Sequence, residues 1–135
     1  AVEEEYSLLC SSPLLERARH NGFGFLAHSP LAGGVLTGKY RHTTPPDSRA
    51  AYTHLRSSVE PYLKSSLPIV EALSQAAHGL ECSIADVALA WVEGTPGVTS
   101  AIIGPRNLVQ LEQILNGRID LPLPIRQVLS EVSAK

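Results

Sequence analysis

Short apolar runs alternate along the chain with stripes of apolar positions that recur at helical spacing. The short runs predict strands over 2–9, 23–27 and 98–103. The middle run is apolar at every position, which is typical of a parallel strand covered on both faces, whereas the acidic start of the first run is expected at a rim of the sheet. The stripes predict helices, each preceded by a serine or asparagine cap and followed by glycine, over 13–21, 84–93 and 108–116. This alternation predicts an α/β fold with a parallel sheet.

The remaining stretches are less regular. Residues 28–55 are rich in Pro, Gly, Ser and Thr, so we expect a long loop of the kind that is usually functional or disordered. Apolar positions between Leu63 and Ala77 then recur at helical spacing, and Pro68 interrupts them, so either two helical pieces or one kinked helix is expected. A last amphipathic helix is expected over 124–132. No linker divides the chain, so we expect residues 1–135 to form a single unit.

Composition narrows the possible functions. With 44% hydrophobic and 18% charged residues, the sequence is typical of a globular protein. The net charge of -2 is spread over interleaved acids and bases, so we expect no nucleic-acid binding. No apolar stretch approaches the ~18 residues of a membrane span, and the acidic first residues differ from a signal peptide. We therefore expect a soluble, cytoplasmic protein without a membrane partner.

Metal binding is not expected either. Cys10 and Cys82 have no second cysteine or histidine at the spacing of a zinc site, and no two histidines are spaced as ligands. We interpret both cysteines as reduced thiols.

The chain starts without Met inside a strand-like segment, and we interpret it as a fragment of a longer protein.

Two groups of residues follow predicted strands in a way that suits an anion. Ser29, Leu31 and Gly33 lie just past the second strand, where glycine lets the backbone approach a phosphate. A plain glycine turn is the alternative interpretation. The second group follows the third strand and lies at the N-terminus of a capped helix, whose free amides and dipole favour an anion; its members are Gly104, Arg106, Gln110 and Gln113.

Two side chains of the second group have a simpler interpretation as well. The planar fork of Arg106 suits a phosphate, but a solvated loop arginine is the alternative. Gln110 could complete a capping box with Asn107, a role compatible with ligand binding.

Trp91 is expected in the core, where it packs its helix on the sheet.

One long segment resembles a known family. Residues 28–40, HSPLAGGVLTGKY, are similar to a signature of aldo-keto reductases that follows the seventh strand of their barrel. The resemblance continues, in the family's order, at 5–9 (EYSLL), 88–92 (ALAWV), 96–100 (PGVTS), 103–107 (IGPRN) and 110–111 (QL). It implies a partial (β/α)₈ TIM barrel, namely strands six to eight with their helices and a C-terminal helix, and active sites of this fold lie at the carboxyl ends of the strands.

The resemblance also assigns roles. It implies that Ser29 and the Leu31 backbone contact the pyrophosphate of NADP, and that Arg106 contacts its 2′-phosphate. His28 stands where the family commonly has a ring that stacks on the nicotinamide. His28 is itself a departure, since a tyrosine is common there. Two further positions depart from the family pattern, because Glu3 stands where glutamine is frequent and Ile114 where asparagine is common.

The resemblance implies an oxidoreductase that transfers hydride between NADPH and a small aldehyde or ketone, with a catalytic tyrosine, lysine, aspartate and histidine. None of the four tyrosines stands in that motif, so we assign no catalytic residue. We therefore expect a truncated reductase that is inactive without its missing half. Two alternatives remain: a non-catalytic cofactor-binding or interaction module, and a half-barrel that pairs with a second copy through its exposed strand edges.

Overall fold

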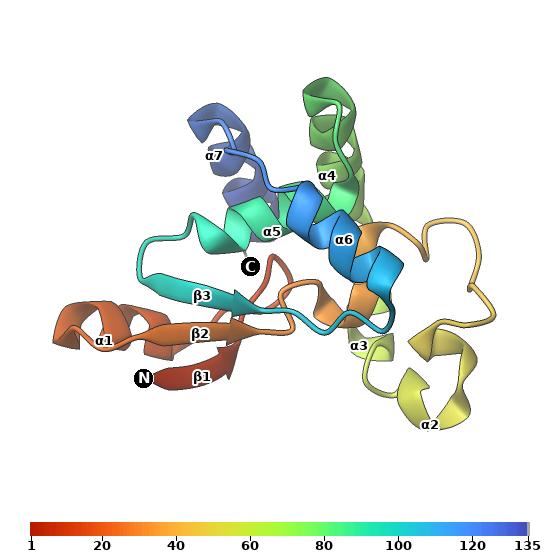
Figure 1. Ribbon diagram of the computed structural model, residues 1–135, viewed down its shortest axis with the longest axis horizontal. Helices are drawn as coiled ribbons and strands as arrows, with labels where there is room; N and C mark the ends of the chain where they lie inside the picture. The colour runs from red at the N-terminus through yellow and green to blue at the C-terminus, as the bar shows by residue number, and fades with distance from the viewer. Residues whose placement is uncertain (135) are drawn as a thin grey trace.

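A three-stranded parallel sheet forms the centre of the computed structural model, which describes residues 1–134. Its order is β1 (Val2–Glu5), β2 (Phe25–His28) and β3 (Val98–Ile102). Helix α1 (Pro13–Asn21) connects β1 to β2, and α5 (Ile84–Glu93) precedes β3 (Figure 1). The expected α/β alternation is confirmed, and α1, α5 and β3 lie where expected, whereas β2 starts two residues later than the expected 23–27.

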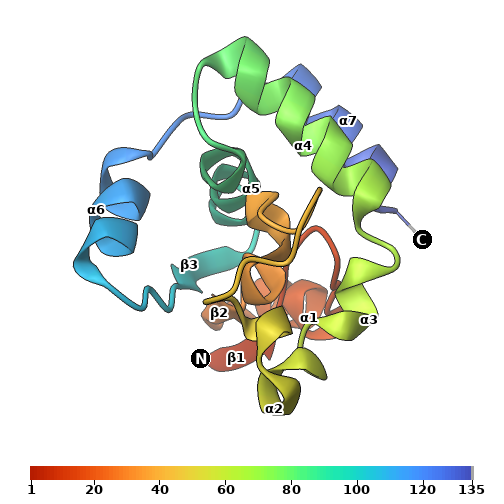
Figure 2. The ribbon, with the colours of Figure 1, turned by 90° about the vertical axis from the view of Figure 1, so that its right-hand side faces the viewer.

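The two faces of the sheet differ. Phe25 and Ala27 are fully buried and pack into the core beneath α1 and α5, which lie on the same side of the strands (Figure 2). Alternation along the strand turns Leu26 and His28 to the opposite face, where they are half-buried. Their neighbour Ile102 is 38% exposed. The expectation that β2 is covered on both faces was therefore wrong for this chain, because no described helix lies against the second face.

Strand β1 is shorter than expected. It ends at Glu5, so the acidic segment is the strand itself, and the apolar residues after it lie in the connection to α1. Reciprocal backbone hydrogen bonds between Ser7 and Cys10 turn the chain there. The ring of Tyr6 then stacks on Trp91, with centroids 5.6 Å apart, and meets Phe25 edge-on. Trp91 is buried, which confirms its expected place in the core.

Helix α4 (Leu67–Leu80) is continuous. Pro68 lies in its first turn, where the missing N–H has no intrahelical partner to lose, so the helix has no kink there. The expected apolar run falls on two helical pieces, because Leu63 ends α3 (Glu60–Leu63) and the later positions lie on α4. Helix α7 (Leu123–Ser133) matches the last expected helix and lies beside α4 in both views (Figures 1 and 2). No helix among residues 1–134 has the length and apolar character that crossing a membrane requires.

The segment expected as a loop contains short helical turns. These are η1 (Ala32–Thr37), η2 (Arg49–Ala51) and α2 (Thr53–Arg56), followed by α3 (Glu60–Leu63). Val59 is fully buried, and the Arg41 guanidinium donates to both carboxylate oxygens of Glu71 on α4 at 2.8 and 2.9 Å. The segment is thus packed onto the rest of the molecule.

Helix α6 (Leu108–Asn116) starts and ends where expected but does not pack as expected. Four apolar side chains were expected to face the core, yet none is buried, and Leu108 and Leu115 are 67% and 58% exposed. The helix projects beyond the outer edge of β3, where the described residues place no further strand beneath it (Figure 1).

Candidate functional site

The two groups of candidate residues leave the same edge of the sheet. His28 ends β2 and pairs in register with Ile102, the last residue of β3. Ser29, Leu31 and Gly33 continue from His28, and Gly104 follows β3 by two residues. Because carboxyl ends of adjacent parallel strands lie together, both groups begin side by side.

The first group begins with a coupled pair. His28 Nδ1 and Ser29 Oγ lie 3.1 Å apart, within hydrogen-bond distance, and both residues are half-buried. Ser29 has a φ of 52°, which is uncommon for a residue other than glycine. This backbone conformation turns the chain sharply away from β2 and leaves the His28 ring on the uncovered face of the sheet.

The glycines of the η1 turn have a packing reason of their own. Gly33 has a φ of 65°, and a Cβ there would lie 2.6 Å from Val59 Cγ1. Gly34 has a φ of 95°, and a Cβ there would meet only the flexible end of the Lys39 side chain, so its backbone conformation and not its packing favours glycine. The Leu31 carbonyl accepts the amides of Gly34 and Leu36 at 3.0 and 3.1 Å, which closes the turn. Glycine at 33 is therefore required by the chain itself, whatever else binds there.

The second group forms a well-defined helix start. Asn107 Oδ1 accepts from the Gln110 amide at 2.9 Å, which caps α6. Gln110 Oε1 accepts from the Arg106 amide at 2.8 Å, one residue before the position that a capping box uses, so the expected box is replaced by a related contact. No atom lies within 4 Å of a Cβ built at Gly104, so the backbone there borders open space.

Arg106 connects the two loops. Its side chain is exposed, and Nη1 donates to the Asp47 carbonyl at 2.8 Å. One hydrogen bond leaves four of its five N–H donors for other partners. Gln113 is exposed in the second turn of α6, beyond the first four amides that a helix leaves free, so it lies farther from the helix start than expected.

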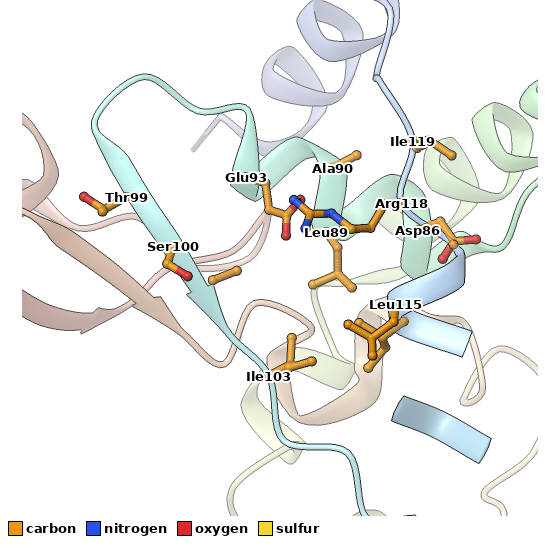
Figure 3. A pocket seen from close by; sticks show the side chains of 13 residues that line it. Asp86, Leu89, Ala90, Glu93, Thr99, Ser100, Ile103, Leu115, Arg118 and Ile119 are labelled. Atoms are coloured by element: carbon orange, nitrogen blue, oxygen red, sulfur yellow. The ribbon is translucent and has the colours of Figure 1, made fainter. Parts of the chain in front are cut away.

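The departures at Glu3 and Ile114 from the family pattern have a structural consequence. Glu3 is exposed and pairs in register with Leu26, so it lies on the uncovered face together with His28. Ile114 lines a cavity of about 340 Å³ between α6, α5 and the edge of β3 (Figure 3). Arg118 and Glu93 form an ion pair at its rim, with Nη2 and Oε2 3.3 Å apart, and none of the eight candidate residues lines it.

Sequence reasoning missed a contact beside the site. The Tyr62 hydroxyl on α3 donates a short hydrogen bond to the carboxylate of Glu5, which is the register partner of His28. Burial raises the pKa of the Tyr62 hydroxyl, and the hydrogen bond and charge of Glu5 raise it further. The two residues are 57 positions apart, and no local pattern indicates their contact.

A three-stranded parallel sheet with two loops at the carboxyl ends of adjacent strands defines the class as a parallel α/β protein, and this arrangement is consistent with part of a (β/α)₈ barrel. A family model described as the aldo/keto reductase family matches residues 1–130. The chain therefore belongs to the aldo/keto reductase family, a family of oxidoreductases, and the resemblance found in the sequence is confirmed.

Individual relatives agree with this assignment. The chain is 36% identical over 105 residues to L-glyceraldehyde 3-phosphate reductase of Escherichia coli K12, a match that covers 76% of this chain and 30% of the relative. It is 34% identical over 115 residues to a probable voltage-gated potassium channel subunit beta of Oryza sativa, with 84% and 35% covered. The chain thus spans about a third of the length of these relatives.

A solved structure shows the same fold. The crystal structure of a thermostable aldo-keto reductase in complex with the inhibitor epalrestat superposes with a TM-score of 0.66 at 19% identity, covering 96% of this chain and 38% of the other. The three parallel strands and their helices are consistent with a partial barrel of this type.

Proposed function

We propose that this chain is the cofactor-binding side of an aldo-keto reductase, comprising strands six to eight of the barrel, and that it binds NADP(H) through its phosphates. The observation that carries the proposal is the arrangement of two loops at one edge of the sheet, bridged by the Arg106 hydrogen bond to the Asp47 carbonyl. Phosphate sites of (β/α)₈ barrels frequently follow strands seven and eight, which β2 and β3 would be.

The residues present suit the chemistry of such a cofactor. Gly104 borders open space before a helix whose first amides attract an anion, and Arg106 has donors left for a 2′-phosphate. Ser29 offers a hydroxyl to the pyrophosphate, and the His28 ring offers a face to the nicotinamide. The bound dinucleotide would supply the hydride. Gln113 would contribute only from the second turn of α6.

The chain would not carry out the reduction of an aldehyde or ketone by itself. A general acid works best with a pKa near the working pH. Burial raises the pKa of both Tyr6 and Tyr62, which makes these hydroxyls poorer proton donors. We propose that proton donation to the carbonyl substrate needs residues from barrel segments outside this chain.

A non-catalytic cofactor-binding or interaction module is the second candidate. It is favoured by the matches to probable voltage-gated potassium channel subunits beta, the second from Arabidopsis thaliana at 35% identity over 119 residues. Both candidates bind NADPH, so the state of the chain separates them. Tight binding by a monodisperse chain favours the module, whereas binding by a chain that associates favours a reductase segment that needs the rest of its barrel.

The proposal is tested by titrating the purified chain with NADPH and NADH while following the fluorescence of the reduced nicotinamide. We expect Arg106→Gln to weaken NADPH binding by about tenfold, since hydrogen bonds to charged groups contribute about 1.5–3 kcal/mol. NADH binding should change little, because NADH has no 2′-phosphate. Arg17→Gln, at an exposed arginine on α1, is the matched control and should match the wild type. Equal loss for both nucleotides, or no loss, contradicts the proposed role of Arg106.

A further inference from the structure

A second cavity lies on the helical side of the sheet, away from the candidate cofactor residues. It has a volume of about 450 Å³ and is bounded by α7, the carboxyl end of α5 and the connection between β1 and α1. None of the eight cofactor candidates lines it. Arg126 is the one charged side chain among the lining residues, which include no aspartate or glutamate.

Arg126 is held firmly at this cavity. Its Nη1 and Nη2 donate to the carbonyls of Trp91 and Ala90 at 2.7 and 2.6 Å, at the carboxyl end of α5. Gly94 leaves room for the guanidinium, because a Cβ there would lie 2.1 Å from Nη2. A fixed arginine keeps its donors in a defined direction, and so recognises a ligand at a smaller cost in side-chain entropy.

The guanidinium retains binding capacity. Two of its five N–H donors are used by the two carbonyls, which leaves three. Among residues 1–134, no ion pair includes Arg126. A half-buried cation of this kind is stabilised by an anionic partner, because the helix carbonyls supply only partial negative charge.

The remaining wall mixes apolar side chains with the hydroxyls of serine and threonine residues. Leu8, Leu9 and Pro96 line the cavity together with Trp91, whose indole N–H donates to Ser130 Oγ at 3.0 Å. Ser133 adds a hydroxyl on the α7 side. The cavity therefore combines one cationic corner with a wall that is only partly apolar, and its volume lies in the range of about 300–1,000 Å³ that is usual for small-molecule sites.

We propose that this cavity binds a small amphipathic carboxylate, whose carboxylate group accepts hydrogen bonds from Arg126 and whose apolar body packs against Leu8, Leu9 and Trp91. An inorganic anion would use only the cationic corner, and a neutral molecule of the same shape would leave the guanidinium without an anionic partner. The site is independent of the proposed NADP(H) site.

Trp91 allows a direct test, because it is the one tryptophan of the sequence and lines the cavity. The full chain is titrated with hexanoate, with its neutral isostere hexanamide and with inorganic phosphate, and tryptophan fluorescence is followed. We expect a saturable response to hexanoate and at least about tenfold weaker responses to the other two, since an Arg–carboxylate pair is a charge-assisted hydrogen bond. An equal response to hexanamide, or no saturable response to hexanoate, overturns the proposal.

Two variants separate recognition by Arg126 from folding. Arg126→Gln should weaken hexanoate binding by at least about tenfold, whereas Arg118→Gln, at the rim of the other cavity, should leave it unchanged. If Arg126→Gln unfolds the chain, Ser133→Phe provides the second variant, because it fills the cavity with Arg126 intact and should abolish the response. Wild-type affinity in a folded Arg126→Gln, or in Ser133→Phe, overturns the proposal.

Discussion

Gly33 and Gly104 show at the scale of single residues that glycine serves two different purposes near the proposed site. Gly33 combines a positive φ with a close approach of Val59, so that a side chain there has neither an allowed backbone nor space. Gly104 has open space around it and no positive φ. The first glycine is needed to fold the turn, whereas the second leaves room at the start of α6.

Alanine substitution at these two positions should therefore have unequal effects. Gly33→Ala should lower the free energy of unfolding by about 1–3 kcal/mol, from backbone strain and overpacking against Val59. Gly104→Ala should change it by less than about 0.5 kcal/mol, as expected for an exposed site without special geometry. Urea unfolding followed by circular dichroism measures both, and similar losses in the two variants would contradict the structure around Gly33.

At the scale of elements, the segment between β2 and α4 is fastened at points far apart in sequence. Tyr62 on α3 donates to Glu5 at the end of β1, and Val59 is buried against the η1 turn. These contacts hold α3 over the carboxyl edge of the sheet, next to His28. The hydrogen bond thus fastens α3, which packs against the η1 turn that contains Gly33.

The Tyr62 hydrogen bond makes the free energy of unfolding depend on pH in the alkaline range. The pKa of Tyr62 is raised above the unfolded-state value of about 10, so the native state holds this proton more tightly. Its stabilisation is fully present below about pH 10 and is lost as the pH rises through the folded-state pKa. Tyr62→Phe should lower stability by about 1 kcal/mol at neutral pH and should show a smaller further loss above pH 10 than the wild type.

The measurement is urea unfolding at neutral and at alkaline pH. Tyr52→Phe is the control, because the Tyr52 side chain is 46% exposed. A Tyr62→Phe variant as stable as wild type at neutral pH, with the same alkaline loss, would show that the contact with Glu5 stabilises nothing.

Sequence predicted those elements whose determinants are local. Ser12, Ser83 and Asn107 mark the starts of α1, α5 and α6 because their side chains accept from amides two or three residues ahead. The sequence did not predict those features that depend on contacts between residues far apart in the chain. The apolar stripe of α6 resembles that of a packed helix whether or not a neighbouring element is present, and the buried position of Val59 depends on a turn 26 residues earlier, at Gly33.

For the candidate site, too, the sequence predicted the local features and not the contacts between distant residues. The order of strands and loops predicted that the segments starting at His28 and Gly104 leave one edge of the sheet, and the resemblance to aldo-keto reductases suggested their role. The bridge from Arg106 to the Asp47 carbonyl was not predictable, because the two residues are 59 positions apart in irregular segments. The close approach of Val59 to Gly33 was not predictable either, because these two residues are also far apart in the sequence.

At the scale of the whole molecule, one face of the sheet and much of α6 remain uncovered. Leu108, Val109 and Leu115 are each more than half exposed and lie beyond the outer edge of β3. This chain matches only 38% of the solved aldo-keto reductase, so that protein has further residues that can cover the corresponding surfaces. Exposed strand edges and apolar patches of this kind favour association.

We therefore expect the isolated chain to associate as its concentration rises. Size-exclusion chromatography with light scattering should give an average mass above the 14.5 kDa of one chain. The double substitution Leu108→Glu and Leu115→Glu should lower that mass towards one chain, whereas Leu67→Glu, at a leucine 58% exposed on α4, should not. A wild-type chain that stays monomeric at every concentration would exclude both association and the self-pairing half-barrel.

The central claim is that the loops after β2 and β3 together bind the phosphates of NADP(H). The most direct test is a titration of the isotope-labelled chain with NADP⁺, followed by amide chemical shifts in nuclear magnetic resonance spectra. We predict that the largest shift changes fall in two stretches, 29–34 and 104–110, and that they saturate together. Absence of saturable changes, or changes confined to other parts of the chain, would contradict the account.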